Sequence, residues 1–288
     1  MAEPTLLGYP VTLLFLYFLS YSFCGWCTET MYCSFRSRHF VPRGFLYGPI
    51  CPIYGAGVLL MILFFTPLQD NLVAFYFVAV MVMTTWEYFV GWFLETTTHI
   101  KYWDYSGAPF NIKGRVCLPI SLCWGAMSYL AVFGIHPFVA AVFLAMPLWL
   151  RHLLSGISLA ALLADTSVTI RDLAQATRLL DKLQMAGDEL RVQMALARAD
   201  LSDDLDAVGE TLHKKLETVL LSLPPVAAER LDALRRNYDE LLVKTEIRTR
   251  RFRRGYQRMT SKRYRLDDLA AAGARLRKKL RETVKRER

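Results

Sequence analysis

Phe23-Cys24-Gly25-Trp26-Cys27-Thr28-Glu29-Thr30 decides the fold, because it returns further along the chain as Phe89-Val90-Gly91-Trp92-Phe93-Leu94-Glu95-Thr96. A second pattern follows each copy. Gly44-x4-Pro49-Ile50-x3-Tyr54-Gly55-Ala56 reads again as Gly114-x4-Pro119-Ile120-x3-Trp124-Gly125-Ala126. Two patterns in the same order indicate an internal duplication, in which each copy carries one glutamate inside a mostly apolar run.

The chain has two parts of very different composition. All six Trp and all six Cys lie before Asp165. Most of the charged residues, and the whole net charge of +9, lie after it. This contrast predicts a membrane domain over 1–165 and a soluble, charged tail over 166–288. The positive charge of the tail is concentrated after residue 247, so we expect any polyanion-binding surface there.

Five apolar stretches are long enough to span a membrane, which takes about 20 residues. They cover residues 9–33, 48–66, 72–97, 116–134 and 137–165. The predicted fold class is all-α, a polytopic helical membrane protein with five transmembrane helices. The motif-bearing spans would run in the same direction, so the copies, about 9–66 and 72–134, would be parallel repeats. The fifth span, 137–165, stands outside the duplication.

Basic residues gather in alternate loops, which predicts the orientation of the chain. The loops after the first and third spans hold Arg36, Arg38, Arg43, Lys101, Lys113 and Arg115. The other two short loops, Pro67–Asn71 and Gly134–Pro137, hold no Lys or Arg. By the positive-inside rule the basic loops are cytoplasmic, which places the N-terminus outside and the C-terminal tail in the cytoplasm.

Acidic residues inside the predicted spans are the first candidates for a site. Glu29, Glu87, Glu95 and Asp165 are costly in a membrane, so they are expected to face a bundle interior or a wet cavity. Two interpretations remain open for the acids that the duplication repeats, Glu29 and Glu95. They either pair structurally with Arg43 and Arg115, or line a path or site for a substrate, an ion or a lipid headgroup.

Arg151 also lies in a predicted span and would need a partner there. Glu87 is the nearest candidate by estimated depth, and a helix broken at Pro147 is the alternative. The cysteines, including Cys24-x-x-Cys27, sit mostly in apolar helix, and the second copy replaces this pair with Val90 and Phe93. Packing explains them better than a metal or redox site, so we expect no metal and no cofactor.

The loops after the first and third spans are rich in Gly, Pro and aromatic residues. The loop after the third span also contains Asp104 and Asn111. The two loops are either interfacial turns or part of a functional surface. Three motifs stand out in these loops and in the span before the first of them. They are Phe23-x-Gly25-Trp26-x-x-Glu29-Thr30, Arg43-Gly44-Phe45-Leu46-x-Gly48-Pro49-x-x-Pro52-Ile53-Tyr54-Gly55 and Trp103-Asp104-Tyr105-Ser106-x-x-Pro109-Phe110-Asn111-x-x-Gly114.

In these motifs the chain resembles the ABC-transporter type IV membrane proteins of bacteria, over about residues 13–170. The resemblance implies a permease-like protein of the bacterial cytoplasmic (inner) membrane. Relatives tend to have Asn before the Arg-Gly pair, where this chain has Pro42. The long tail lies outside the resemblance.

Apolar residues in the tail recur at spacings of three, four and seven over 170–223, which indicates a long amphipathic helix. Pro224-Pro225 interrupts this pattern, and a second helical segment follows. We favour an antiparallel helical hairpin, with an intermolecular coiled coil, and hence a homo-oligomer formed through the tail, as the alternative.

A strip over 248–265 is strongly basic, with aromatic residues between the charges. It holds Arg248, Arg250, Arg251, Arg253, Arg254, Arg258, Lys262, Arg263 and Arg265. We expect such a strip to bind membrane lipids with anionic headgroups or an acidic partner protein. Binding of nucleic acid is expected less, because the membrane is near. The alternative is a solvated basic helix.

The chain contains no Gly-x4-Gly-Lys-Ser/Thr loop, so ATP hydrolysis would need a separate ATPase subunit. Our first hypothesis is a permease-like subunit whose loops 34–47 and 98–116 dock that partner. A second is a membrane enzyme acting on lipid-linked substrates, with Glu29, Glu95 or Asp104 as acid/base groups and Arg43 and Arg115 on a phosphate. A third is a scaffold whose tail recruits partners. We assign no catalytic residue.

The predicted orientation can be tested with reporter fusions or cysteine accessibility at Asp70 and Arg171. The alternating Lys and Arg bias places these residues on opposite sides of the membrane. Two reporters on the same side would contradict the topology.

Overall fold

A computed structural model describes residues 3–65, 68, 70–199, 225–256, 259–261 and 263–264. The chain divides into two compact units. The first comprises residues 1–171 together with 251–261, and the second comprises 172–250 together with 262–288. The first unit holds the apolar helices, and the second holds most of the charged tail.

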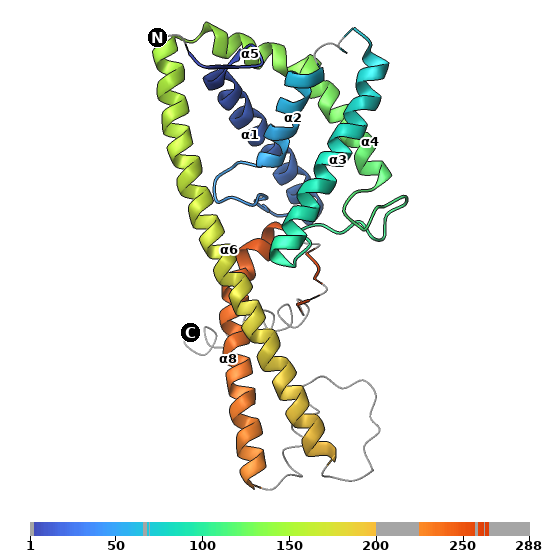
Figure 1. Ribbon diagram of the computed structural model, residues 1–288, viewed down its shortest axis with the longest axis vertical. Helices are drawn as coiled ribbons and strands as arrows, with labels where there is room; N and C mark the ends of the chain where they lie inside the picture. The colour runs from blue at the N-terminus through green and yellow to red at the C-terminus, as the bar shows by residue number, and fades with distance from the viewer. Residues whose placement is uncertain are drawn as a thin grey trace. The chain divides into compact units, whose positions relative to one another are not determined.

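The described part of the chain is almost entirely helical, which confirms the predicted class (Figure 1). A two-stranded hairpin, β1 (Thr5–Leu6) and β2 (Tyr9–Pro10), precedes the first helix. The helices are α1 (Val11–Ser37), α2 (Pro52–Phe65), α3 (Leu72–Thr98), α4 (Leu118–Tyr129), the π-helical η2 (Leu130–Ile135), α5 (His136–Ala145), α6 (Leu148–Ala199) and α8 (Pro225–Gly255).

Four helical stretches among the described residues are long and apolar enough to cross a membrane. They are Val11–Ser37, Leu72–Thr98, Leu118–Ala145 and Leu148–Ala195. The predicted second span corresponds to the shorter helix α2, of 14 residues. The structure therefore supports a membrane protein, and the count of five spans stays a prediction.

The predicted fifth span, 137–165, is divided in two. Met146 has extended backbone angles and ends α5, and α6 begins directly after Pro147. Proline disfavours helical angles in the residue before it, which explains the break at this point. In Figure 1, α5 turns across the bundle, and α6 then runs on as one helix of 52 residues.

The first unit is built around two helix pairs. α1 packs against α2, and α3 packs against α4. Figure 1 shows that α1 and α3 run in the same direction. Both helices have 27 residues, and each ends at a residue in the left-handed conformation, Arg38 or His99.

Each helix pair contains a very close approach at a glycine of the duplicated pattern. A Cβ atom on Gly55 would lie 2.3 Å from the carbonyl oxygen of Phe18 on α1. A Cβ atom on Gly125 would lie 2.4 Å from the side chain of Val80 on α3. Gly55 and Gly125 occupy the same place in the duplicated pattern, so the pattern retains glycine where two helices pack most tightly.

The core of the first unit is small for a chain with so many apolar residues. One cluster joins Leu13, Leu14, Tyr17, Tyr21 and Ile62, with α5 residues packed against it. Large apolar side chains elsewhere point outwards, including Phe77, which is 61% exposed. An apolar outer surface of this kind is what the bilayer stabilises in a membrane protein.

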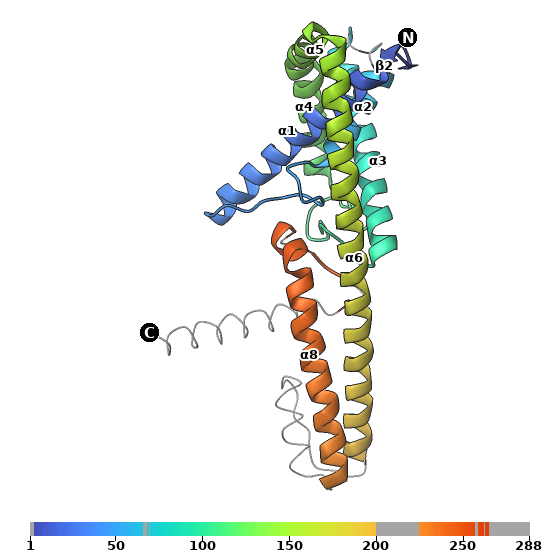
Figure 2. The same cartoon turned by 90° about the vertical axis from the view of Figure 1, so that its left-hand side faces the viewer.

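The second unit contains two long helical segments that lie side by side and run in opposite directions (Figures 1 and 2). One is the part of α6 from Asp172 to Ala199, and the other is the part of α8 from Pro225 to Arg250. Their buried residues follow the predicted apolar pattern and include Leu180, Leu183, Leu190, Leu231 and Tyr238. The predicted helical continuations over 201–223 and 266–280 lie outside the described residues.

We expect Gly55→Ala to destabilise the first unit by roughly 1–3 kcal/mol, because the new methyl group would overlap a backbone carbonyl that cannot move away easily. The matched control is Gly156→Ala in α6, where nothing lies within 4 Å of an added Cβ atom. Thermal unfolding of the purified variants in detergent measures the difference. Equal midpoints for the two variants would contradict the close helix contact.

Candidate functional site

Glu29 of α1 forms an ion pair with Arg43, which lies in the loop between α1 and α2. Arg43 Nε donates to Glu29 Oε2 at 3.0 Å, and the Tyr54 hydroxyl on α2 donates to Glu29 Oε1 at 2.7 Å. Burial works to lower the pKa of Arg43, but Glu29, together with Cys33 and Tyr256, outweighs burial and raises the pKa. The ion pair ties the loop to α1.

Glu95 of α3 forms the corresponding pair with Arg115. Arg115 Nε donates to Glu95 Oε2 at 2.8 Å, and its guanidinium also donates to the Tyr88 hydroxyl at 2.9 Å. Arg115 follows Gly114, whereas Arg43 precedes Gly44, the equivalent glycine of the first copy. Both glycines have a positive φ, so both loops turn at this point. The acids are equivalent between the copies, and the arginines reach them from opposite sides of the turn.

Glu87, two turns before Glu95 on α3, has a different environment. Its side chain is buried, and it accepts hydrogen bonds from Trp124 Nε1 at 2.9 Å and from the Tyr105 hydroxyl at 3.3 Å. In the described part of the chain Glu87 forms no ion pair with Arg151, the partner that the sequence suggested. The break before α6 is the alternative that the sequence left open.

A cavity of about 380 Å³ joins several of the predicted site residues. It is lined by Glu29 and Arg43 from the first copy and by Glu87 from the second. Tyr54, Tyr105 and Trp124 also line it, and sequence reasoning did not select them as site residues. The signal was present for two of them, because Tyr54 and Trp124 are equivalent positions of the duplicated pattern.

Tyr54 and Trp124 also meet inside the structure. Their ring centroids are 4.9 Å apart, so the second helices of the two pairs approach each other through these aromatic side chains. Each ring donates one hydrogen bond to an acid of its own copy, Tyr54 to Glu29 and Trp124 to Glu87. Acids and aromatic rings that contact one another thus make up part of the cavity wall.

Asp104 and Asn111 shape the loop after α3. Asp104 Oδ1 accepts from the backbone N–H of Ser106 at 3.0 Å, and the Asn111 side chain accepts from the N–H of Gly114 at 3.1 Å. Burial works to raise the pKa of Asp104, but the hydrogen bonds from Ser106 and the charge of Lys101 lower it below its usual value. Both side chains are engaged in holding the turn.

Asp165 fixes the other loop to α6. Its carboxylate accepts from the backbone N–H groups of Tyr47 at 2.8 Å and Gly48 at 2.7 Å. Asp165, Asp104, Asn111, Glu95 and Arg115 do not line the cavity. They hold the loops and helices that surround it.

Part of the basic strip belongs to the first unit and packs on these loops. Arg251 lies 3.2 Å above the ring of Tyr47 and donates to the carbonyl of Phe45 at 3.2 Å. Tyr256 packs edge-on against Tyr102, and Thr260 exchanges two backbone hydrogen bonds with Lys101. We call residues 251–261 the C-terminal strap. The periodicity of the sequence does not predict that these residues contact the loops.

The other basic residues of the strip have varied surroundings. Within the second unit, Arg248 lies 3.9 Å from Asp172 and Arg263 lies 2.9 Å from Asp181. Arg250 is exposed, and Arg253 is partly buried. The side chains of Arg254, Arg258, Lys262 and Arg265 lie outside the described residues. Binding of this strip to anionic lipid stays a prediction.

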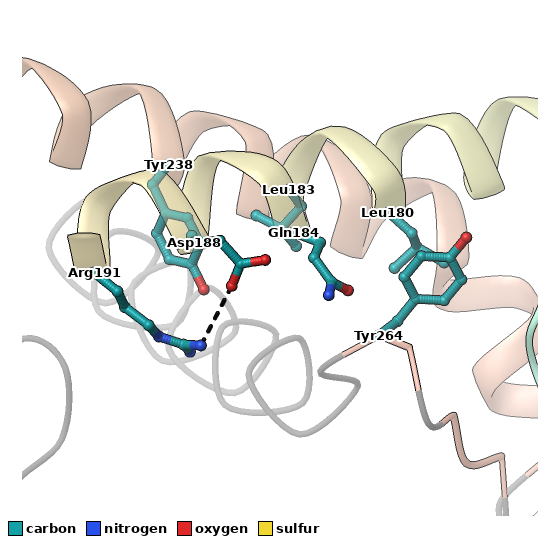
Figure 3. A pocket seen from close by; sticks show the side chains of 8 residues that line it. Leu180, Leu183, Gln184, Asp188, Arg191, Tyr238 and Tyr264 are labelled. Carbon is teal, nitrogen blue, oxygen red and sulfur yellow. Dashed lines mark hydrogen bonds and ion pairs between the residues drawn. The ribbon is translucent and has the colours of Figure 1, made fainter. Parts of the chain in front are cut away.

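The second unit has a small pocket of its own (Figure 3). Figure 3 shows Leu180, Leu183 and Tyr238 at its wall, with Arg191 and Asp188 joined across 3.5 Å. Its volume of about 30 Å³ is close to the space of one water molecule, so we regard it as a packing gap.

The described residues contain no cluster of three or more His, Cys, Asp or Glu residues that could hold a metal ion. All six cysteines are free thiols.

Comparison with known proteins gives one match. No curated protein and no solved structure matches the chain. The model of the family described as "Putative ABC-transporter type IV" matches residues 16–170, which is more than half of the chain and covers every residue of the cavity. The chain therefore belongs to the ABC-transporter type IV family that this description names.

Proposed function

We propose that this protein is a permease-like membrane subunit of an ABC-type transporter and that its cavity is where the substrate binds. The observation that carries the proposal is a cavity of about 380 Å³ with acidic and aromatic walls inside a set of apolar helices. Polar groups at such a position are costly unless they serve packing or a pathway. Family membership supports the transporter assignment.

We propose further that the cavity lies at the interface of two parallel repeats. Three features support this: the equivalent helix pairs, the common direction of α1 and α3, and an acid paired with arginine in each copy. Tyr54 and Trp124 meet where an axis relating the repeats would pass. Many transporters place the substrate at such an interface.

The proposed membrane arrangement has α1, α2, α3, α4 with η2, and the first part of α6 as five crossings, with α5 lying across the bundle. The basic loops and the tail would then face the cytoplasm of a bacterium, and the N-terminus would lie outside. The cavity would open on the cytoplasmic side, since loop residues Arg43 and Tyr105 line it.

A separate ATPase subunit would supply the energy, because the chain contains no phosphate-binding loop for ATP. Its docking surface would include the loops 34–47 and 98–116. The C-terminal strap packs on both loops, so it would form part of that surface or leave it when the partner binds.

The geometry favours a permease over a membrane enzyme. A general acid or base must reach the substrate, but Asp104 is engaged in its own turn and Glu95 lies outside the cavity lining. Glu29 lines the cavity, but Arg43 and Tyr54 engage both of its oxygens. Arg115 is held by Glu95, which leaves it poorly placed for a phosphate. A scaffold function would leave the cavity without a role.

Purification of the tagged protein from native membranes should recover an ATPase subunit. The second test uses Cys123, which lines the cavity and is exposed. In the purified complex we expect ATP to change the rate at which Cys123 reacts with a maleimide, because a transport cycle changes access to the substrate site. No associated ATPase, together with ATP-independent labelling, would contradict the proposed function.

We expect Glu29→Gln to reduce transport more strongly than Glu95→Gln. Both substitutions remove one charge of an ion pair, but only Glu29 lines the cavity. The glutamine keeps the side-chain shape, so both proteins should still reach the membrane. Transport rate per molecule, normalised to protein level, is the measurement. An equal loss of folded protein in both variants would show that the pairs are structural only.

A further inference from the structure

Glu87 is the acid of the cavity that has no basic partner in the described part of the chain. Glu29 and Glu95 each lie within 3.0 Å of an arginine nitrogen. Glu87 is 4% exposed, and its two hydrogen bonds come from neutral donors, an indole N–H and a phenol O–H. Both of its oxygens are engaged by these donors. A buried carboxylate is stabilised when a positive charge pairs with it, and a cation bound in the cavity would supply that charge.

The arginines that line the cavity are not placed to neutralise Glu87. Arg43 is engaged by Glu29 at 3.0 Å and lies 5.1 Å from the ring of Tyr256. Arg36 lies in the last turn of α1 and is exposed, so water screens its charge. Among the described residues, neither arginine of the lining therefore pairs with Glu87.

Aromatic rings form most of the remaining wall. Tyr54, Trp124 and Tyr105 lie beside the two acids, and Tyr32, Tyr102 and Trp103 also line the cavity. The faces of such rings attract alkylated ammonium groups, which lose less hydration energy than small metal ions on entering an apolar site. The cavity volume of about 380 Å³ is at the lower end of the range for small-molecule sites.

We propose that the cavity binds a small organic cation, with the ammonium group against Glu87 and the rings of Tyr54 and Trp124. This inference rests on the proposed function for the location of the substrate and adds its chemical class. Glu87 supplies the charge, and the aromatic rings supply the apolar contact that distinguishes an organic cation from Na⁺ or K⁺.

The test measures how ligands protect Cys123, in a full-length variant that keeps this cysteine alone, reconstituted in lipid nanodiscs without any ATPase. Three probes of similar size are compared: choline, its uncharged isostere with carbon in place of nitrogen, and the anion isethionate. We expect choline to slow maleimide labelling at concentrations about tenfold lower than the isostere requires, because one favourable charge contact corresponds to about that factor. Isethionate should give no protection.

Variants identify the residue responsible. Glu87→Gln should abolish the preference for choline over its isostere. Glu87→Asp retains the charge and should keep this preference. The aspartate variant provides the test if the glutamine variant does not fold. Asp70→Asn is the control, because it removes an exposed carboxylate outside the cavity, and it should behave like the parent protein. Protection by isethionate, or equal protection by choline and its isostere, would overturn the proposal. No ATPase is present in this experiment. Its result is therefore independent of the test of the transporter assignment, which measures the effect of ATP on labelling.

Discussion

Two ion pairs, Glu29–Arg43 and Glu95–Arg115, are the interactions on which the arrangement of the first unit depends. A carboxylate in an apolar helix is stable only if a strong donor reaches it. In each copy the arginine that does so comes from the loop after the helix. Because the arginine of each loop must reach the glutamate on the preceding helix, each loop folds back against that helix. The loops then cover the ends of the helices and enclose a space between the two pairs.

The cavity owes its chemistry to a departure from symmetry. Trp124 takes the place of Tyr54, and Glu87 takes the place of Tyr21. In the first copy Tyr54 donates to the acid that is already paired, whereas Trp124 donates to Glu87, for which the described residues provide no cation. Tyr21 instead makes a hydrogen bond with His136 at 2.8 Å. An asymmetric site can thus arise from two copies of one pattern.

The sequence predicted the features that local rules control. The apolar lengths predicted the helical class, the motifs predicted the family, and one interpretation of the duplicated acids named Arg43 and Arg115 as partners. Other features depend on contacts between distant residues and leave no periodic signal. The packing of Arg251 on Tyr47 and the two hydrogen bonds from Trp124 and Tyr105 to Glu87 are of this kind. The break at Pro147 was visible as a possibility, but hydropathy alone could not separate one long span from two helices.

A crystal structure of the protein with tetramethylarsonium would locate the cation site, because arsenic gives an anomalous signal. We expect a peak inside the cavity, next to the Glu87 carboxylate and within about 6 Å of the Trp124 ring, the range of a cation–π contact. A cavity without a peak at saturating ligand, or with Glu87 paired to an arginine of the chain, would show that the cavity is not a site for organic cations.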